Sequence, residues 1–294
     1  MNIKDRFITV GRTARVPPRL LIVLANPRSG STWLFDALRC HPCVYVESRG
    51  TVYKYFGLLG RRYPADLSGR KNGGVKIEVR QGRWAAIPAF EIGELRPLVS
   101  ARIVEKRYAV EKIHPHFFDF NVKEFVKCLG EMEKRATVKV CYLVRDPKQS
   151  IVSFLEYKKR NPSWNRQRAI QDVPKHMRQI YESIYRTASA WPGPVVEYGD
   201  LKRSFDTTIG NLFEFLWPGE KTDGRLINRI YDMTARKRWI TGGNRFIAKR
   251  ESSDEEVLGG YRSLLRAYED EISQCYQEYE AVLQLGQSSR GSLE

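Results

Sequence analysis

The sequence has few of the residues that build disulfide frameworks, metal sites and membrane spans. It contains five cysteines and four histidines in 294 residues. An odd and sparse set of cysteines argues against a disulfide framework. Cys40 and Cys43 have Cys-x-x-Cys spacing, but no second pair exists to complete a zinc site. The most apolar early run, residues 20–25, is far shorter than the roughly 20 residues that cross a bilayer. We therefore expect no metal site and no transmembrane segment.

The sequence also lacks repeats, low-complexity blocks and a convincing linker. The simplest organisation is one domain over residues 1–294, with a core over about 18–250 and a C-terminal helical segment over about 254–285. Residues 1–19 are basic but have no apolar core, so we expect no secretory signal and a reducing, cytoplasmic location.

Positive charge is abundant. Lysine and arginine total 50 against 34 acidic residues, which gives a net charge of +16. Such an excess attracts anionic partners: nucleic acid, an anionic membrane or a small polyanionic cosubstrate. The basic residues are spread in small groups without a polybasic tail, which weakens the nucleic-acid interpretation.

Short apolar runs alternate with helical patterns along the chain. Residues 20–24 and 138–144 predict buried parallel strands, each followed by a loop and a helix. Weaker strands are expected near residues 44–46, 75–79, 108–113 and 195–198. This alternation predicts an α/β fold, a P-loop-containing central parallel β-sheet flanked by helices on both faces.

A glycine-containing loop, residues 25–32, joins the first strand to its helix. Such a loop aims backbone N–H groups and the positive end of the helix dipole at one point, which suits phosphate or sulfate. Ser31 and Thr32 are good N-cap types for that helix. Compared with the Walker A pattern, the first glycine is Ala25 and the lysine is Ser31. A nucleotide kinase would lose its γ-phosphate lysine, and the cation lies instead inside the loop, at Arg28.

A second basic group follows the strand at 138–144. Arg145 at the carboxyl end of a parallel strand faces the crevice where doubly wound sheets bind ligands, and its guanidinium can grip a phosphate. Asp146 can cap the next helix and Pro147 suits its first turn. Ser153 lies in an otherwise apolar helix, where a serine is costly unless its hydroxyl meets a ligand. The alternative is an ordinary strand-to-helix turn with a solvent-facing serine.

These two motifs carry a family resemblance. Pro-Arg-Ser-Gly-Ser-Thr-Trp, residues 27–33, resembles the 5′-phosphosulfate loop of sulfotransferases that use 3′-phosphoadenosine-5′-phosphosulfate (PAPS), in the form found in bacterial and carbohydrate-modifying members. Arg145-Asp146-Pro147 with Ser153 resembles their 3′-phosphate site. The resemblance implies that Arg28 contacts the phosphosulfate and that Trp33 lies near the adenine. It implies a 5′-phosphate site made of Ser29, Gly30, Ser31 and Thr32.

Two later segments are similar to the same family. Residues 195–201 resemble a strand followed by Tyr-Glu-Asp-Leu, with Gly199 where glutamate is usual. This implies that Tyr198 touches the adenine, although a core tyrosine is the alternative. Residues 242–246 resemble a loop that closes over the nucleotide, which implies binding roles for Gly243, Asn244, Arg245 and, less directly, Arg250.

The catalytic base has several candidates. The segment around Lys112 and His114 is similar to the family's Lys-x-His segment, which implies His114 as general base and Lys112 near the leaving-group oxygen. Both would share one side of an extended chain. Glu47 and His116 are the alternatives. Two other histidines have structural interpretations, with His41 expected in a turn and His176 on a helix surface.

The resemblance implies sulfuryl transfer from PAPS to a hydroxyl or amine of an unidentified acceptor, with release of 3′-phosphoadenosine-5′-phosphate (PAP) and no metal. The acceptor could be a small molecule, a lipid or a glycan, and peripheral membrane contact stays open. Nucleic acid is not expected as a partner. The rival interpretations are a P-loop kinase and a non-catalytic nucleic-acid-binding protein. Acceptor loops are expected at residues 51–74, 81–102 and 161–172.

Overall fold

The fold is described by a computed structural model for residues 19–46, 95–115, 120–160, 172–236 and 258–291. Several sequence predictions lie outside these residues: the strand near 75–79, the base candidates Glu47 and His116, the loop with Gly243, Asn244 and Arg245, Arg250, and most of the expected acceptor loops.

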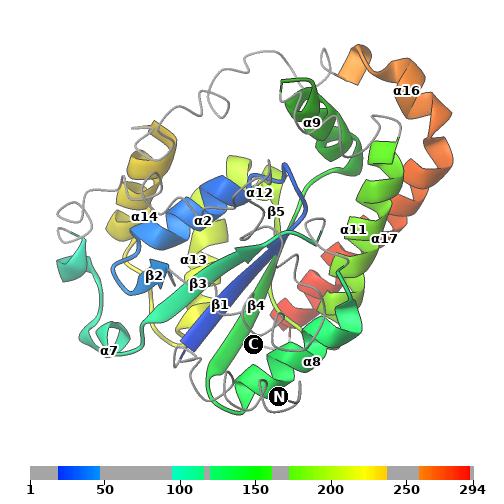
Figure 1. The fold of residues 1–294 in the computed structure, drawn as a ribbon. Coiled ribbons are helices and arrows are strands. Elements are labelled where there is room, and N and C mark those ends of the chain that lie inside the picture. The colour runs from blue at the N-terminus through cyan, green and yellow to red at the C-terminus, as the bar shows by residue number, and fades with distance from the viewer. Residues whose placement is uncertain (1–18, 47–94, 116–119, 161–171, 237–257, 292–294) are drawn as a thin grey trace, which may run out of the picture.

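The described core is built on one parallel sheet. Five strands lie in the order β2-β3-β1-β4-β5 (Figure 1). All neighbouring pairs are parallel. The strands are β1 (Arg19–Ala25), β2 (Val44–Val46), β3 (Tyr108–Ile113), β4 (Thr137–Val144) and β5 (Val195–Glu197). The predicted parallel α/β architecture is therefore confirmed.

Helices cover both faces of the sheet (Figure 1). One layer holds α2 (Ser31–Cys40), α12 (Tyr198–Arg203), α13 (Phe205–Leu216) and α14 (Gly224–Tyr231). The other layer holds α8 (Val122–Glu133), α9 (Pro147–Arg160), α11 (Val173–Ala190) and α17 (Glu269–Gly291). The remaining short elements are η1 (Arg96–Leu98), α7 (Ala101–Val104), η4 (Asp232–Arg236) and α16 (Arg262–Ala267).

The central strand β1 explains why its sequence is a continuous apolar run. Alternate residues of a strand point to opposite faces, and both faces of this strand are covered. Leu21 and Val23 join the core under α2 and α13, while Leu20 and Ile22 join the core under α8 and α11. All four side chains are fully buried.

The strand order gathers the functional segments at one end of the sheet. From β1 the chain passes to the edge strand β2, returns through β3, and then crosses β1 to reach β4. The central strand is thus a switch point, where doubly wound sheets bind ligands beyond the carboxyl ends of the strands. The loop after β1, Lys112 at the end of β3, His114 just beyond it and Arg145 after β4 all occupy this end.

The predicted helices after β4 and at the C-terminal side are present. Asp146 Oδ1 accepts the Gln149 N–H at 2.9 Å, and Pro147 is the first residue of α9, so the predicted cap is confirmed. The helical segment expected over 254–285 consists of α16 and the longer α17, which extends to Gly291. No helix in the described ranges is both long enough and apolar enough to cross a bilayer.

Candidate active site

The loop after β1 has an unusual backbone. Gly30 lies in the left-handed region with φ 79°, and Arg28 lies there with φ 66°. Glycine enters this region at little cost, whereas a residue with a Cβ pays about 1–3 kcal/mol and is typically found at functional sites. A Cβ on Gly30 would also lie 2.4 Å from Cδ2 of Tyr198, so the site excludes any larger residue.

This geometry corrects one prediction about the helix start. The N-cap of α2 is Gly30, and Ser31 is the first helical residue, so neither Ser31 nor Thr32 is the cap. The left-handed turn at Gly30 is what lets the chain enter the helix in this way. The first turn of α2 contains no acidic side chain, so the positive end of its dipole and its free N–H groups are left for an anion.

Arg28 and Arg145 lie side by side, although 117 residues separate them. Arg145 Nη1 donates to the carbonyl oxygen of Arg28 at 3.1 Å. Arg28 Nε donates to Ser153 Oγ at 3.4 Å. The loops after β1 and β4 therefore form one cationic surface, and the half-buried Ser153 contacts this surface.

Tyrosine rings support both guanidinium groups. Arg145 lies over the ring of Tyr198, 4.6 Å from its centroid, and Arg28 lies over the ring of Tyr157 at 5.0 Å. Such cation–π contacts fix a guanidinium without neutralising it. Tyr198 is the first residue of α12, because β5 ends at Glu197 and not at Tyr198 as the sequence indicated. Its ring thus lies between Arg145 and Gly30.

His114 has a fixed tautomer. Its Nδ1 lies 2.8 Å from the carbonyl oxygen of Ala25, and a carbonyl can only accept a hydrogen bond, so Nδ1 carries the proton. Nε2 therefore carries the acceptor lone pair, and it lies 3.4 Å from Ser31 Oγ. Burial, together with the charges of Lys112 and Arg28, lowers the pKa of His114 to about 3. The ring is neutral at physiological pH.

Lys112 points to the same helix turn as His114. Its Nζ donates to Thr32 Oγ1 at 3.3 Å, next to the Ser31 hydroxyl that His114 contacts. The prediction that both side chains share one side of the strand end is confirmed. Burial lowers the pKa of Lys112 to about 8, despite the opposing effect of Asp36.

Asp36 is a buried carboxyl group beneath Lys112 that the sequence analysis missed. It lies on α2 one turn after Thr32, and burial raises its pKa to about 7. Arg39 Nη1 donates to its Oδ1 at 3.4 Å. An aspartate in an amphipathic helix normally faces solvent, so its spacing gave no signal of this burial.

Trp33 packs into the helical layer. Its ring stacks on Phe205 with centroids 5.4 Å apart, and its Nε1 donates to Thr234 Oγ1 at 3.2 Å. These contacts hold Trp33 against α13 and η4. Its expected position near an adenine stays a prediction.

The two histidines that were given structural interpretations, His41 and His176, are both buried. His41 lies in the turn after α2, as predicted; its Nδ1 accepts the Cys43 N–H at 3.1 Å and its ring stacks on Trp217 at 4.5 Å. His176 is 8% exposed within α11, so its prediction as a surface residue was wrong.

Cys40 and Cys43 are buried free thiols. Within the described ranges no group of three or more metal-ligating side chains occurs.

A buried hydrogen-bond network joins the two loops from below, and the sequence gave no signal of it. Asn26 Nδ2 donates to Ser150 Oγ at 2.9 Å and to the Tyr181 hydroxyl at 3.2 Å. The Tyr181 hydroxyl in turn donates to the carbonyl oxygen of Arg145. Tyr181 was recognisable only as a core aromatic residue of a helix, since periodicity does not say where a hydroxyl points.

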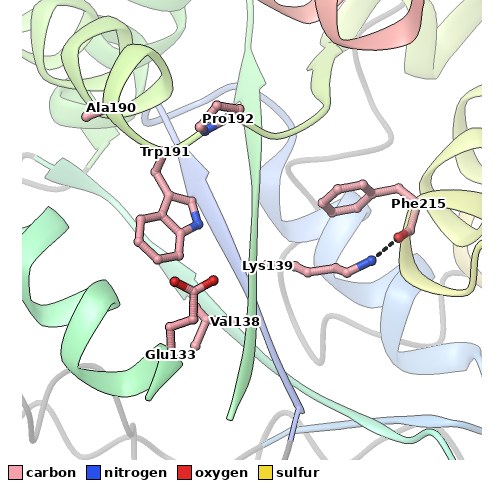
Figure 2. A pocket seen from close by; sticks show the side chains of 7 residues that line it. All are labelled: Glu133, Val138, Lys139, Ala190, Trp191, Pro192 and Phe215. Atoms are coloured by element: carbon pink, nitrogen blue, oxygen red, sulfur yellow. Dashed lines mark hydrogen bonds between the residues drawn. The ribbon is translucent and has the colours of Figure 1, made fainter. Parts of the chain in front are cut away.

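A pocket at the other end of the sheet is unrelated to this site. Figure 2 shows it around Val138 and Lys139, at the start of β4, whereas Arg145 follows the end of that strand. The Lys139 ammonium group donates to the carbonyl oxygen of Phe215. None of the predicted site residues lines this pocket, which is formed by Glu133, Val138, Lys139, Ala190, Trp191, Pro192 and Phe215.

Solved sulfotransferase structures are similar to this chain, and the mouse enzyme shares its fold. Mouse sulfotransferase SULT7A1, solved in complex with PAP, is 13% identical with a TM-score of 0.52, over 98% of this chain and 94% of that chain. The sulfotransferase domain of the Synechococcus PCC 7002 olefin synthase is 20% identical with a TM-score of 0.43, over 85% and 96%. Sulfotransferase STF9 from Mycobacterium avium is 12% identical with a TM-score of 0.45, over 92% and 80%.

The sequence was also compared with curated proteins and with family models. No curated protein matches it. The family model described as the sulfotransferase domain matches residues 18–237, which include β1 to η4 and all the site residues described above. The chain therefore belongs to the sulfotransferase family.

Proposed function

We propose that this sulfotransferase takes its sulfuryl group from PAPS, transfers it to a hydroxyl or amine of a small-molecule, lipid or glycan acceptor, and releases PAP. The observation that carries the proposal is the contact between Arg145 and Arg28, which joins the two loops expected to bind phosphate into one surface. The mouse structure that shares the fold holds PAP, which supports the same choice of nucleotide.

The residues present fit a nucleotide with phosphates on both sides of its ribose. The start of α2 and Arg28 would hold the 5′-phosphosulfate, because free N–H groups and a guanidinium converge there. Arg145 and Ser153 would hold the 3′-phosphate, since a guanidinium and a hydroxyl face one surface. A kinase lysine is missing, and Ser31 in its place contacts His114 instead.

The proposed step is an in-line displacement at sulfur. The acceptor oxygen or nitrogen forms a bond to sulfur while the bond between sulfur and the 5′-phosphate oxygen breaks. The acceptor proton passes to His114 Nε2, the ring nitrogen that carries no proton in this tautomer. Negative charge grows on the departing phosphate oxygen, and Lys112 and Arg28 stabilise it.

The low pKa of His114 in the protein alone is compatible with a role as the base. The charges of Lys112 and Arg28 are part of what lowers this pKa. A bound phosphosulfate would offset both charges, so the pKa of His114 would rise when the donor binds. The alternatives Glu47 and His116 stay predictions from the sequence.

We also propose, from the sequence, that residues 1–294 form a single sulfotransferase domain that works in the cytoplasm. Within the described residues, one sheet with a core on each face supports the single-domain organisation. Peripheral membrane contact by a lipid acceptor stays compatible with this location.

A transfer assay with two labelled donors tests the proposed function. The protein is incubated with sulfur-labelled PAPS and a panel of phenols, lipids, aminoglycosides and glycans, and in parallel with γ-labelled ATP, Mg²⁺ and the same panel. We expect label to move from PAPS to one acceptor class and none to move from ATP. Transfer from ATP alone would overturn the proposal in favour of a kinase.

A further inference from the structure

We propose that the C-terminal helix α17 is a positioning element of the nucleotide site, and that Tyr276 and Tyr279 are the positioning residues through which it acts. The inference rests on the proposed use of PAPS and extends it to a segment with no assigned role. The match to the sulfotransferase domain ends at residue 237, so the whole of α17 lies outside it.

Tyr276 holds the loop that carries Arg145. Its hydroxyl donates to Asp146 Oδ2 at 2.6 Å. The other oxygen of Asp146 accepts the Gln149 N–H at 2.9 Å, so the carboxylate is held on both sides. Burial and the neighbouring Asp146 raise the pKa of Tyr276, which keeps the hydroxyl protonated as a donor.

Tyr279 lies near the start of α12, the helix that carries Tyr198. It lies three residues after Tyr276, on the same side of the helix, and burial together with the nearby carboxylate of Glu197 raises the pKa of its hydroxyl. Glu197 Oε2 accepts the Asp200 N–H at 3.1 Å and thereby caps α12. The first residue of α12 is Tyr198, whose ring supports the guanidinium of Arg145.

A third contact reaches the backbone of Arg145 itself. The ring of Tyr279 meets the ring of Tyr181 edge-on, with centroids 6.2 Å apart. The Tyr181 hydroxyl donates to the carbonyl oxygen of Arg145. Adjacent turns of α17 thus act on Arg145 through Asp146, through Tyr181 and through α12.

The helix is rigidly placed to do this. It packs along α11 and also meets α9 and β5. At Gly286 its backbone approaches so closely that a Cβ would lie 2.6 Å from Cβ of Val195. A site residue held by packed, hydrogen-bonded neighbours binds its ligand better than a loosely held one, because less order is lost on binding. Binding of the 3′-phosphate should therefore depend on α17 more than binding of the 5′-phosphate does.

The test measures how strongly the protein prefers PAP over adenosine 5′-phosphate, which lacks the 3′-phosphate. Calorimetric titration is carried out on wild type, Tyr276→Phe, Tyr279→Phe and the matched control Tyr268→Phe. The Tyr268 hydroxyl makes no hydrogen bond within the described part of the chain. We expect Tyr276→Phe to weaken PAP binding about tenfold, since small displacements of a binding group have effects of this order. Binding of adenosine 5′-phosphate should change less than about twofold.

Each outcome decides a different question. If wild type binds both nucleotides equally, the proposed function fails and the inference fails with it. If wild type prefers PAP and the Tyr276 and Tyr279 variants keep that preference, the inference alone is overturned. Equal loss of affinity for both nucleotides would also overturn it, because a merely structural role of α17 predicts that result. Should Tyr276→Phe not fold, the ratio of the affinities of Tyr279→Phe for PAP and for adenosine 5′-phosphate decides in the same way.

Discussion

Two histidines lie just beyond neighbouring elements: the buried His41 follows α2, and the half-buried His114 follows β3. Burial lowers the pKa of each to about 3. The hydrogen bonds differ in direction. His41 Nδ1 accepts the Cys43 N–H, so its proton lies on Nε2, in a ring packed between Phe213 and Trp217. His114 Nδ1 donates to the carbonyl oxygen of Ala25, so its Nε2 carries no proton and lies 3.4 Å from Ser31 Oγ.

The comparison shows that neither burial nor a perturbed pKa identifies a catalytic histidine. What separates the two is the partner at Nδ1, which decides whether the remaining nitrogen can accept a proton. Cations and hydroxyl groups surround His114, and aromatic rings surround His41. The three predictions that follow test the role of His114, the charge of Lys112 beside it, and the burial that the two histidines share.

The largest expected effect is on turnover. His114→Ala should lower kcat by about 10²–10⁴-fold, the usual contribution of a general base, while PAP still binds. The measurement is the initial rate of transfer from labelled PAPS to the acceptor that the panel yields. The matched control is His41→Gln, which should retain turnover below its melting temperature. Full turnover in His114→Ala would move the role to Glu47 or His116.

A smaller effect is expected on proton exchange during binding. Because the pKa of Lys112 is about 8, the protein alone loses this charge as the pH rises above 8. Bound PAP would favour the charged form, so wild type should take up a proton when it binds PAP near pH 8.5. Calorimetry in two buffers of different ionisation enthalpy measures this uptake. Lys112→Arg should abolish it, and uptake that persists in this variant would place the titrating group elsewhere.

The smallest effect concerns acid stability, where the two histidines should behave alike. Unfolded histidine binds a proton below about pH 6.5, whereas each folded ring stays neutral to about pH 3. The unfolded state is therefore favoured as the pH falls. Each histidine should remove about 2 kcal/mol of unfolding free energy between pH 7 and pH 5.

Urea unfolding of wild type, His41→Phe and His114→Gln at both pH values measures this effect. Each variant should lose less stability on acidification than wild type, by about the amount one histidine contributes. An unchanged pH dependence in His41→Phe would show that His41 is not buried as a neutral ring.

The sequence predicted those features that depend on local pattern. Apolar runs gave four of the five strands closely, and the end of β5 was placed one residue late because Tyr198 is apolar enough to continue a strand but starts α12 instead. The Pro-Arg-Ser-Gly and Arg-Asp-Pro segments indicated two strand-end loops. Both were in the right place, because such loops are fixed by residues that are adjacent in the chain.

Features that depend on distant residues could not be predicted. The bond from Arg145 to the carbonyl of Arg28 requires the strand order of the sheet, which no local pattern specifies. His176 looked exposed because histidine is polar, yet the helix face that carries it is covered. Tyr276 lay in an acidic helix with no motif, and its bond to Asp146 depends on where α17 packs.

The central claim is that Arg28 and Arg145 together bind one nucleotide with phosphates at both ends of its ribose. Calorimetric titration of the wild-type protein with PAP, adenosine 5′-phosphate and ATP, in one buffer at one salt concentration, tests it most directly. The account predicts that PAP binds at least about a hundredfold more tightly than either of the others, which corresponds to about 2.7 kcal/mol. Equal affinities for PAP and ATP, or failure of PAP to bind, would contradict the claim.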